Sequence, residues 1–131
     1  MIERVRAVDA GLAEVWRGAL KDVAARRGGP RYLEDLLGGV EPDAKFAALA
    51  DAGALWCDDA SSFVVVVDRV ILALYVLPRN RRQGRGRALV NFARSDEPRA
   101  RDALALPGDR ATKSLYESVG WKARLLTLGD E

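Results

Sequence analysis

The chain has 131 residues, of which 49% are hydrophobic and 31% are charged, and its formal net charge is +2 at pH 7. It contains no histidine and a single cysteine, Cys57, which excludes Ser-His and Cys-His catalytic pairs, histidine metal sites and internal disulfides. We therefore expect one soluble cytoplasmic domain over 1–131 without a metal or a membrane partner, because the longest apolar run, 70–77, cannot span a bilayer and no signal-peptide pattern begins the chain.

Residues 1–53 predict one strand followed by three helices. Polar and apolar residues alternate over 2–8, which favours a short half-buried strand. Apolar residues recur at helical spacing over 10–26, after the potential cap Asp9. A second helix ends at Gly38 and Gly39, and a third runs from Pro42 to about Gly53. Aromatic residues at these spacings favour a core, with an acceptor pocket as the alternative, and they are Trp16, Tyr32, Phe46 and Trp56.

Residues 54–128 predict most of a sheet. Three β-prone runs, 54–58, 62–67 and 70–77, have connections short enough for an antiparallel meander. A helix over 84–95, a strand over 101–106, a helix capped by Asp109 and a last strand over 121–128 follow. Since a strand–helix–strand crossover joins parallel neighbours, we expect 101–106 to lie parallel to 70–77. The expected fold class is α/β with a mixed sheet.

The positive charge is concentrated after the strand 70–77. Five arginines lie within 79–87, whereas a general nucleic-acid binder more often spreads its charge along a face. Gly84 and Gly86 stand where a helix begins, and the unpaired amides and dipole of a helix N-terminus favour an anion. We expect a phosphate site here, with a basic surface turn as the alternative. The residues of the site are Arg81, Arg82, Gln83, Gly84, Arg85, Gly86, Arg87 and Ala88.

This loop is not one of the two common phosphate motifs. No Gly-Lys-Ser/Thr follows, which excludes a P-loop, and Leu89 stands where the dinucleotide fingerprint needs a third small residue. Arg81-Arg82-Gln83-Gly84-Arg85-Gly86 does match Arg/Gln-x-x-Gly-x-Gly/Ala, the pyrophosphate loop of the GNAT N-acetyltransferase superfamily. The chain resembles that superfamily in this loop.

A second motif strengthens the resemblance. Leu115-Tyr116-Glu117 followed by Gly120-Trp121 is similar to the Leu-Tyr-Glu-x-x-Gly-Phe of the last GNAT helix, and Leu74-Tyr75-Val76 before Pro78 looks like the fourth GNAT strand. The match covers about residues 63–128. It implies a GNAT-like domain in which 54–131 binds the cofactor, 1–53 is the variable acceptor side, and the two central strands, 70–77 and 101–106, splay apart.

The resemblance also implies an activity. An acetyl or other acyl group would pass from acetyl-CoA to an amine of a small molecule or peptide, by direct attack in a ternary complex. Acetyl-CoA would enter between the splayed strands, with its pantetheine arm paired to Tyr75, Val76 and Leu77. Asp109 stands where the family often has an Asn that helps to hold this arm. Which of Arg79, Arg82 and Arg87 meets the 3′-phosphate stays open, as does the identity of the acceptor.

Three residues would carry the chemistry under this resemblance. Tyr116 occupies the position of the general acid that protonates the departing thiolate, and the amide of Tyr75 or a neighbour would stabilise the oxyanion. The strand 70–77 has no carboxylate to serve as a base. Asp58 and Asp59 are candidates, although a role in a hairpin turn is favoured for both. A water relay or capture of a neutral amine is equally open.

A non-catalytic module is the alternative function. The missing carboxylate on the strand 70–77 would suit a domain that only binds CoA or another nucleotide, or that uses its arginine loop on RNA. The chain also lacks the additional last strand of many GNAT members, which predicts an exposed sheet edge and therefore a homodimer.

Overall fold

A computed structural model describes residues 1–130 of the chain. Its centre is a five-stranded sheet in the order β1-β2-β3-β4-β5, in which the first four strands are antiparallel and β5 is parallel to β4. The mixed sheet and the parallel crossover that the sequence predicted are confirmed. The strands are β1 (Ile2–Arg4), β2 (Leu55–Asp58), β3 (Ser62–Val67), β4 (Val70–Val76) and β5 (Asp102–Ala103).

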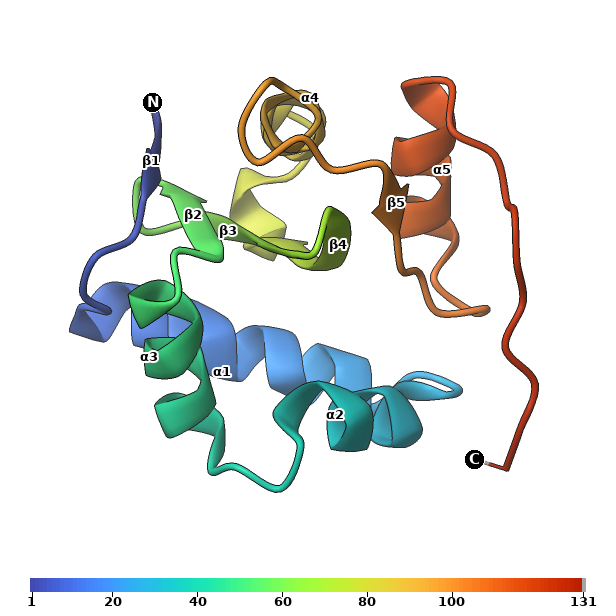
Figure 1. The fold of residues 1–131 in the computed structure, drawn as a ribbon, viewed down its shortest axis with the longest axis horizontal. Coiled ribbons are helices and arrows are strands. Elements are labelled where there is room, and N and C mark those ends of the chain that lie inside the picture. Colours follow the sequence, from blue (N-terminus) through green and yellow to red (C-terminus); the bar gives the residue numbers. More distant parts are fainter. Residues whose placement is uncertain (131) are drawn as a thin grey trace.

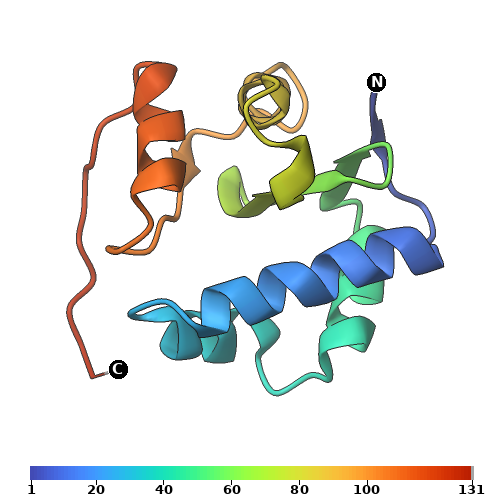
Figure 2. The same cartoon turned by 180° about the vertical axis from the view of Figure 1, so that it is seen from behind.

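The helices form a layer on each face of the sheet. Figure 1 shows α1 to α3 below the strands, α4 above them and α5 beyond β5, and Figure 2 shows α1 running along its face of the sheet. A short 3₁₀ turn, η1 (Pro78–Asn80), joins β4 to the loop before α4. The helices are α1 (Ala10–Ala24), α2 (Gly29–Leu37), α3 (Pro42–Asp51), α4 (Arg85–Ala93) and α5 (Arg110–Ser118). No helix within residues 1–130 is long and apolar enough to cross a membrane.

Strand β3 divides the core into two clusters because successive side chains point to opposite faces. Phe63 and Val65 pack with α1 and α3, whereas Val64 and Val66 pack with α4 and α5. In the first cluster the Trp16 ring stacks on Phe46 with centroids 4.3 Å apart. This stacking holds α1 and α3 against the sheet and makes Trp16 and Phe46 part of the core.

Strands β4 and β5 pair over a short distance only. Their paired residues are Val70 with Asp102 and Ile71 with Ala103, after which the Leu104 amide donates to the Ile71 carbonyl (3.0 Å). Beyond that point β4 bulges, because Val66 pairs with Ile71 but Val65 pairs with Ala73, which leaves Leu72 as an extra residue. A bulge bends and twists its strand. The two central strands therefore separate from Leu72 onward, as the GNAT resemblance implied.

The last predicted strand is wrong. Residues 121–130 carry no secondary structure, and Figure 1 shows this segment running outside α5 without joining the sheet. The side chains of Leu125, Leu126 and Leu128 are 77%, 77% and 89% exposed. Residues 121–128 have no strand to pair with. The neighbouring strand β5 has only two residues, whereas the sequence predicted six over 101–106, so its edge is too short to extend the sheet.

Candidate active site

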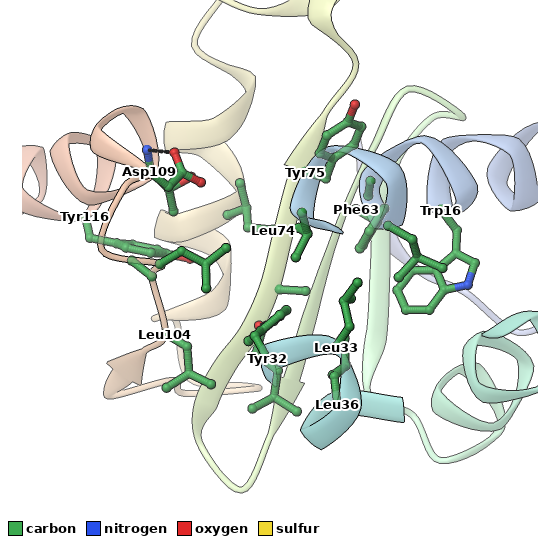
Figure 3. A pocket seen from close by; sticks show the side chains of 18 residues that line it. Trp16, Tyr32, Leu33, Leu36, Phe63, Leu74, Tyr75, Leu104, Asp109 and Tyr116 are labelled. Carbon is green, nitrogen blue, oxygen red and sulfur yellow. Dashed lines mark hydrogen bonds between the residues drawn. The ribbon is translucent and has the colours of Figure 1, made fainter. Parts of the chain in front are cut away.

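A pocket opens where β4 and β5 separate. Its walls come from α1, α2, β4, the segment after β5 and the beginning of α5, and the side chains of Tyr32, Tyr75, Leu104 and Tyr116 surround it in Figure 3. Most of the lining is apolar, and Asp109 is the charged residue among those that line it. The pocket lies in the gap that the sequence assigned to acetyl-CoA.

The arginine loop lies at the end of β4, beside this opening. The amides of residues 82–87 have no hydrogen-bond acceptor within residues 1–130, and Gly84, the N-cap of α4, contributes no side-chain cap. Gly84 has a φ of +78°, and a Cβ placed there would meet nothing within 4 Å. The loop therefore leaves six successive N–H donors without a protein acceptor at the positive end of the α4 dipole, and the space beside Gly84 is open.

Two arginine side chains of the loop, Arg81 and Arg85, are held by hydrogen bonds to other parts of the chain. Arg85 donates to Asp59 (3.1 Å) and Ser61 (3.0 Å) in the β2–β3 turn. Arg81 donates to the Val76 carbonyl (2.8 Å), and its guanidinium lies 5.3 Å from the Tyr75 ring centroid.

The other arginines of the loop are less constrained. Arg87 donates to the Ser118 carbonyl (3.3 Å). Arg79 and Arg82 are exposed and have no polar partner within the described part of the chain. Arg79 and Arg82 are thus the side chains most available to a further phosphate.

The register of β4 determines which backbone groups face the pocket. The Leu77 amide donates to Ser61 (2.9 Å), and alternation then turns the backbone groups of Tyr75 towards Phe63 in β3. By the same alternation, the backbone groups of Leu74 and Val76 point towards the opening, as the bond from Arg81 to the Val76 carbonyl indicates. The amides that face the gap are therefore those of Leu74 and Val76, the two neighbours of Tyr75.

Tyr116 projects from α5 into the pocket. Its side chain is 6% exposed, and its ring stacks on Trp121 with centroids 5.9 Å apart. Burial raises the pKa of the Tyr116 phenol, with smaller contributions from nearby Tyr32 and Asp109. The hydroxyl has no hydrogen-bond partner within residues 1–130 and stays protonated at neutral pH. It is a proton donor without a competing acceptor.

Comparison with known proteins identifies the family. The chain matches the family model of the acetyltransferase (GNAT) domain over residues 43–123, which is more than half of its length. The chain belongs to the GNAT acetyltransferase family. Its structure is similar to that of AAC(6′)-Iy in complex with the bisubstrate analogue CoA-S-monomethyl-acetylneamine, at a TM-score of 0.53 and 16% identity, with 100% of this chain and 99% of that chain covered. This likeness shows a shared fold. A search of curated proteins found no match.

Other residues predicted for the GNAT site have structural roles that the geometry makes plain. The amide of Ala88 donates to the Gly84 carbonyl (3.0 Å), so the row of unpaired amides ends at Arg87. A Cβ at Gly86 would lie 3.1 Å from the Leu115 side chain. The close packing of α4 on α5 therefore requires a small residue at position 86, whether or not Gly86 also lets a phosphate approach the backbone.

The two predicted carboxylates lie in different environments. Asp109 accepts hydrogen bonds from the amide (3.1 Å) and hydroxyl (2.7 Å) of Thr112, which confirms it as the cap of α5, and it also lines the pocket. Asp58 lies at the end of β2, 3.6 Å from Arg85 and 3.2 Å from the ammonium of Met1, and does not line the pocket. A role for Asp58 as the base stays a prediction that requires these ion pairs to open.

Two further residues contribute to the site, one of which no sequence pattern indicates. Asp22 on α1 accepts a hydrogen bond from the Tyr75 hydroxyl (2.9 Å), and nothing in the sequence distinguishes it from other polar residues of that helix. Tyr32 was assigned to the core or to an acceptor pocket. It lines the pocket, whereas Trp56 packs on Phe92 on the α4 side of the sheet.

Proposed function

We propose that this GNAT domain transfers an acetyl group from acetyl-CoA to an amine by direct attack in a ternary complex. The observation that carries the proposal is the row of unpaired amides at 82–87, open to solvent beside the separated strands β4 and β5. Such a row suits a diphosphate, since each anionic oxygen can accept from several N–H groups at a helix N-terminus. The CoA-containing analogue bound to the similar AAC(6′)-Iy supports the same ligand class.

The donor set of the chain fits each part of the cofactor. The diphosphate would rest on the amides of 82–87, with Arg79 or Arg82 beside the 3′-phosphate. The pantetheine arm would lie along β4 and pair with the inward-facing backbone groups of Leu74 and Val76, as an added strand does. In this arrangement Arg81 releases the Val76 carbonyl, because the arm needs the acceptor that Arg81 now occupies.

The proposed chemistry uses one amide and one phenol. Acetyl-CoA supplies the thioester that the amine attacks. The Leu74 amide is placed to stabilise the negative charge on the carbonyl oxygen, the role that sequence analysis gave to Tyr75. When the carbon–sulfur bond breaks, the thiolate takes the proton of the Tyr116 hydroxyl, and the phenolate regains a proton from solvent, which has received one from the attacking amine. Burial raises the pKa of Tyr116, so the phenol carries its proton at neutral pH but is a weak acid, whose hydrogen bond stabilises the departing thiolate before the proton moves.

Deprotonation of the acceptor is assigned to solvent rather than to a side chain. The one acidic residue that lines the pocket, Asp109, is occupied by Thr112 and lies 3.8 Å from Arg26. Proximity of the amine and the thioester supplies much of the rate in such a ternary complex. The proposal therefore requires either that water carries the proton of the amine out of the pocket or that the amine is already uncharged when it binds.

The test is release of CoA thiol from acetyl-CoA with a panel of polyamines, aminoglycosides, amino acids and peptides. We expect turnover with at least one class of amine. Tyr116→Phe should lower kcat by about a hundredfold, the lower range for loss of a general acid. The affinity for CoA, measured by calorimetry, should change by less than about twofold, because the ring and its packing on Trp121 remain. A Tyr116→Phe protein with the full rate would remove Tyr116 from the mechanism.

A non-catalytic module is the second candidate. The pocket offers no carboxylate on β4, which suits a domain that holds CoA without turnover. Binding of CoA with no thiol release for any amine would favour this function. Binding of RNA with an affinity that falls steeply with salt would instead assign the arginine loop to nucleic acid.

A further inference from the structure

Tyr32 reaches from α2 to the point where β4 and β5 separate. Its hydroxyl donates a hydrogen bond to the carbonyl of Leu72, the extra residue of the β4 bulge. Figure 3 shows Tyr32 beside β4, at the opposite end of the drawn site from Tyr75. A side chain of the acceptor-side half thus binds the backbone of the central strand just past its last pair with β5.

The surroundings of the Tyr32 ring are apolar. Leu33 and Leu36 of α2 lie beside it in the pocket lining, together with Leu104 and Leu106 from the segment after β5. Such a lining favours hydrocarbon and disfavours an unpaired charge. The ring therefore forms part of the wall of an apolar pocket beside β4.

The positions along β4 set a length scale for an acyl group in this pocket. The diphosphate donors lie at 82–87, and the amide assigned to the thioester oxygen is that of Leu74. Leu72, which Tyr32 binds, is two residues further, a distance of about 7 Å along a strand. That space accommodates a short acyl group before it meets the Tyr32 ring.

We propose that Tyr32 is a specificity-determining residue, whose ring limits the acyl group carried into the pocket to two or three carbons. The inference rests on the proposed function. The hydroxyl fixes the ring by its bond to Leu72, and the ring supplies the steric limit. Burial raises the pKa of Tyr32 to about 12, so this donor is present throughout the neutral range.

The test measures binding and needs no turnover. S-ethyl-CoA and S-hexyl-CoA are unreactive thioethers whose affinities calorimetry gives directly. The unsubstituted protein should bind S-ethyl-CoA more tightly. In Tyr32→Ala the ratio of the two affinities should shift towards S-hexyl-CoA by about tenfold or more, since each methylene that becomes buried strengthens binding about fourfold. Release of thiol from acetyl-CoA and hexanoyl-CoA should shift in the same direction.

Two further variants test whether the shift comes from the Tyr32 ring. One removes only its hydroxyl, and the other removes a ring elsewhere in the core and so controls for a general loss of packing. Tyr32→Phe keeps the ring and should keep the original ratio. Phe92→Ala removes a partly buried ring that packs on Trp56 outside the pocket, and it too should keep the ratio. If Tyr32→Ala does not fold, Tyr32→Val tests the same point with a smaller cavity, and its expected shift is in the same direction.

Each outcome decides a different claim. An unchanged ratio in Tyr32→Ala or Tyr32→Val, in a protein that still binds CoA, overturns the role of Tyr32 and leaves the proposed function intact. An equal shift in Tyr32→Phe or Phe92→Ala also overturns it. Failure of the unsubstituted protein to bind CoA overturns the proposed function and this inference together.

Discussion

Gly29 shows how closely one residue controls the packing of α2 on α1. It begins α2, three residues before Tyr32, and is buried against the end of α1. A Cβ at this position would lie 1.8 Å from the carbonyl oxygen of Val23. Since that atom belongs to the backbone, α1 and α2 would have to move apart. We expect Gly29→Ala to lower the free energy of unfolding by about 2 kcal/mol or more, measured by urea denaturation.

Gly108 provides the matched control for that substitution. A Cβ at Gly108 meets nothing within 4 Å, and its φ lies outside the left-handed region. Gly108→Ala should therefore change the free energy of unfolding by less than about 0.5 kcal/mol. Equal stabilities for the two variants would contradict the close contact between α1 and α2.

The elements of the fold differ in how well the sequence specifies them. The first helix was predictable because Asp9 caps it, accepting from the Leu12 amide (2.8 Å), and its apolar residues recur at the helical period. The parallel direction of β5 followed from the crossover rule. These features depend on residues close in the chain or on general topology, both of which a sequence displays.

The parts of the site that escaped prediction depend on pairing between distant segments. The Leu72 bulge comes from the register of β4 on β3, and the bond from the Leu77 amide to Ser61 in the same register turns the amide of Leu74 rather than that of Tyr75 towards the pocket. Likewise Arg81 and Arg85 are turned away from the open loop by Val76 and the β2–β3 turn. The pattern of residue types did not reveal that β4 contains one extra residue at the bulge.

The segment 121–130 gives a prediction at the scale of an element. Leu125, Leu126 and Leu128 are exposed and belong to no strand, so they bury little apolar surface in the folded chain. Replacing all three by Ser should change the free energy of unfolding by less than about 1 kcal/mol, since exposed positions contribute little. A much larger loss in urea denaturation would show that this segment packs against the domain or against a second copy.

At the level of the whole molecule, the sheet and the helices place an apolar pocket and the arginine loop along the same strand, β4. Helices α1 and α2 supply apolar lining of the pocket, including Tyr32, and the connection from β4 to α4 supplies the free amides that we propose bind anions. The family match spans 43–123, which includes the loop and α5 but leaves out α1 and α2. Most of the half 1–53, for which the acceptor side is a prediction, therefore lies outside the family match. The homodimer inferred from the sequence stays a prediction.

The central claim is that the unpaired amides of 82–87 bind the diphosphate of CoA, and calorimetric titration of CoA into three proteins tests it most directly. Gly84→Asp places a carboxylate in the open space before α4 without a steric clash, and Gly84→Asn adds a side chain of the same size without charge. Both residues tolerate the left-handed conformation at this position. The unsubstituted protein should bind CoA, Gly84→Asp should bind at least about tenfold more weakly, and Gly84→Asn should lie much closer to the unsubstituted protein. Equal affinity in Gly84→Asp would contradict the claim.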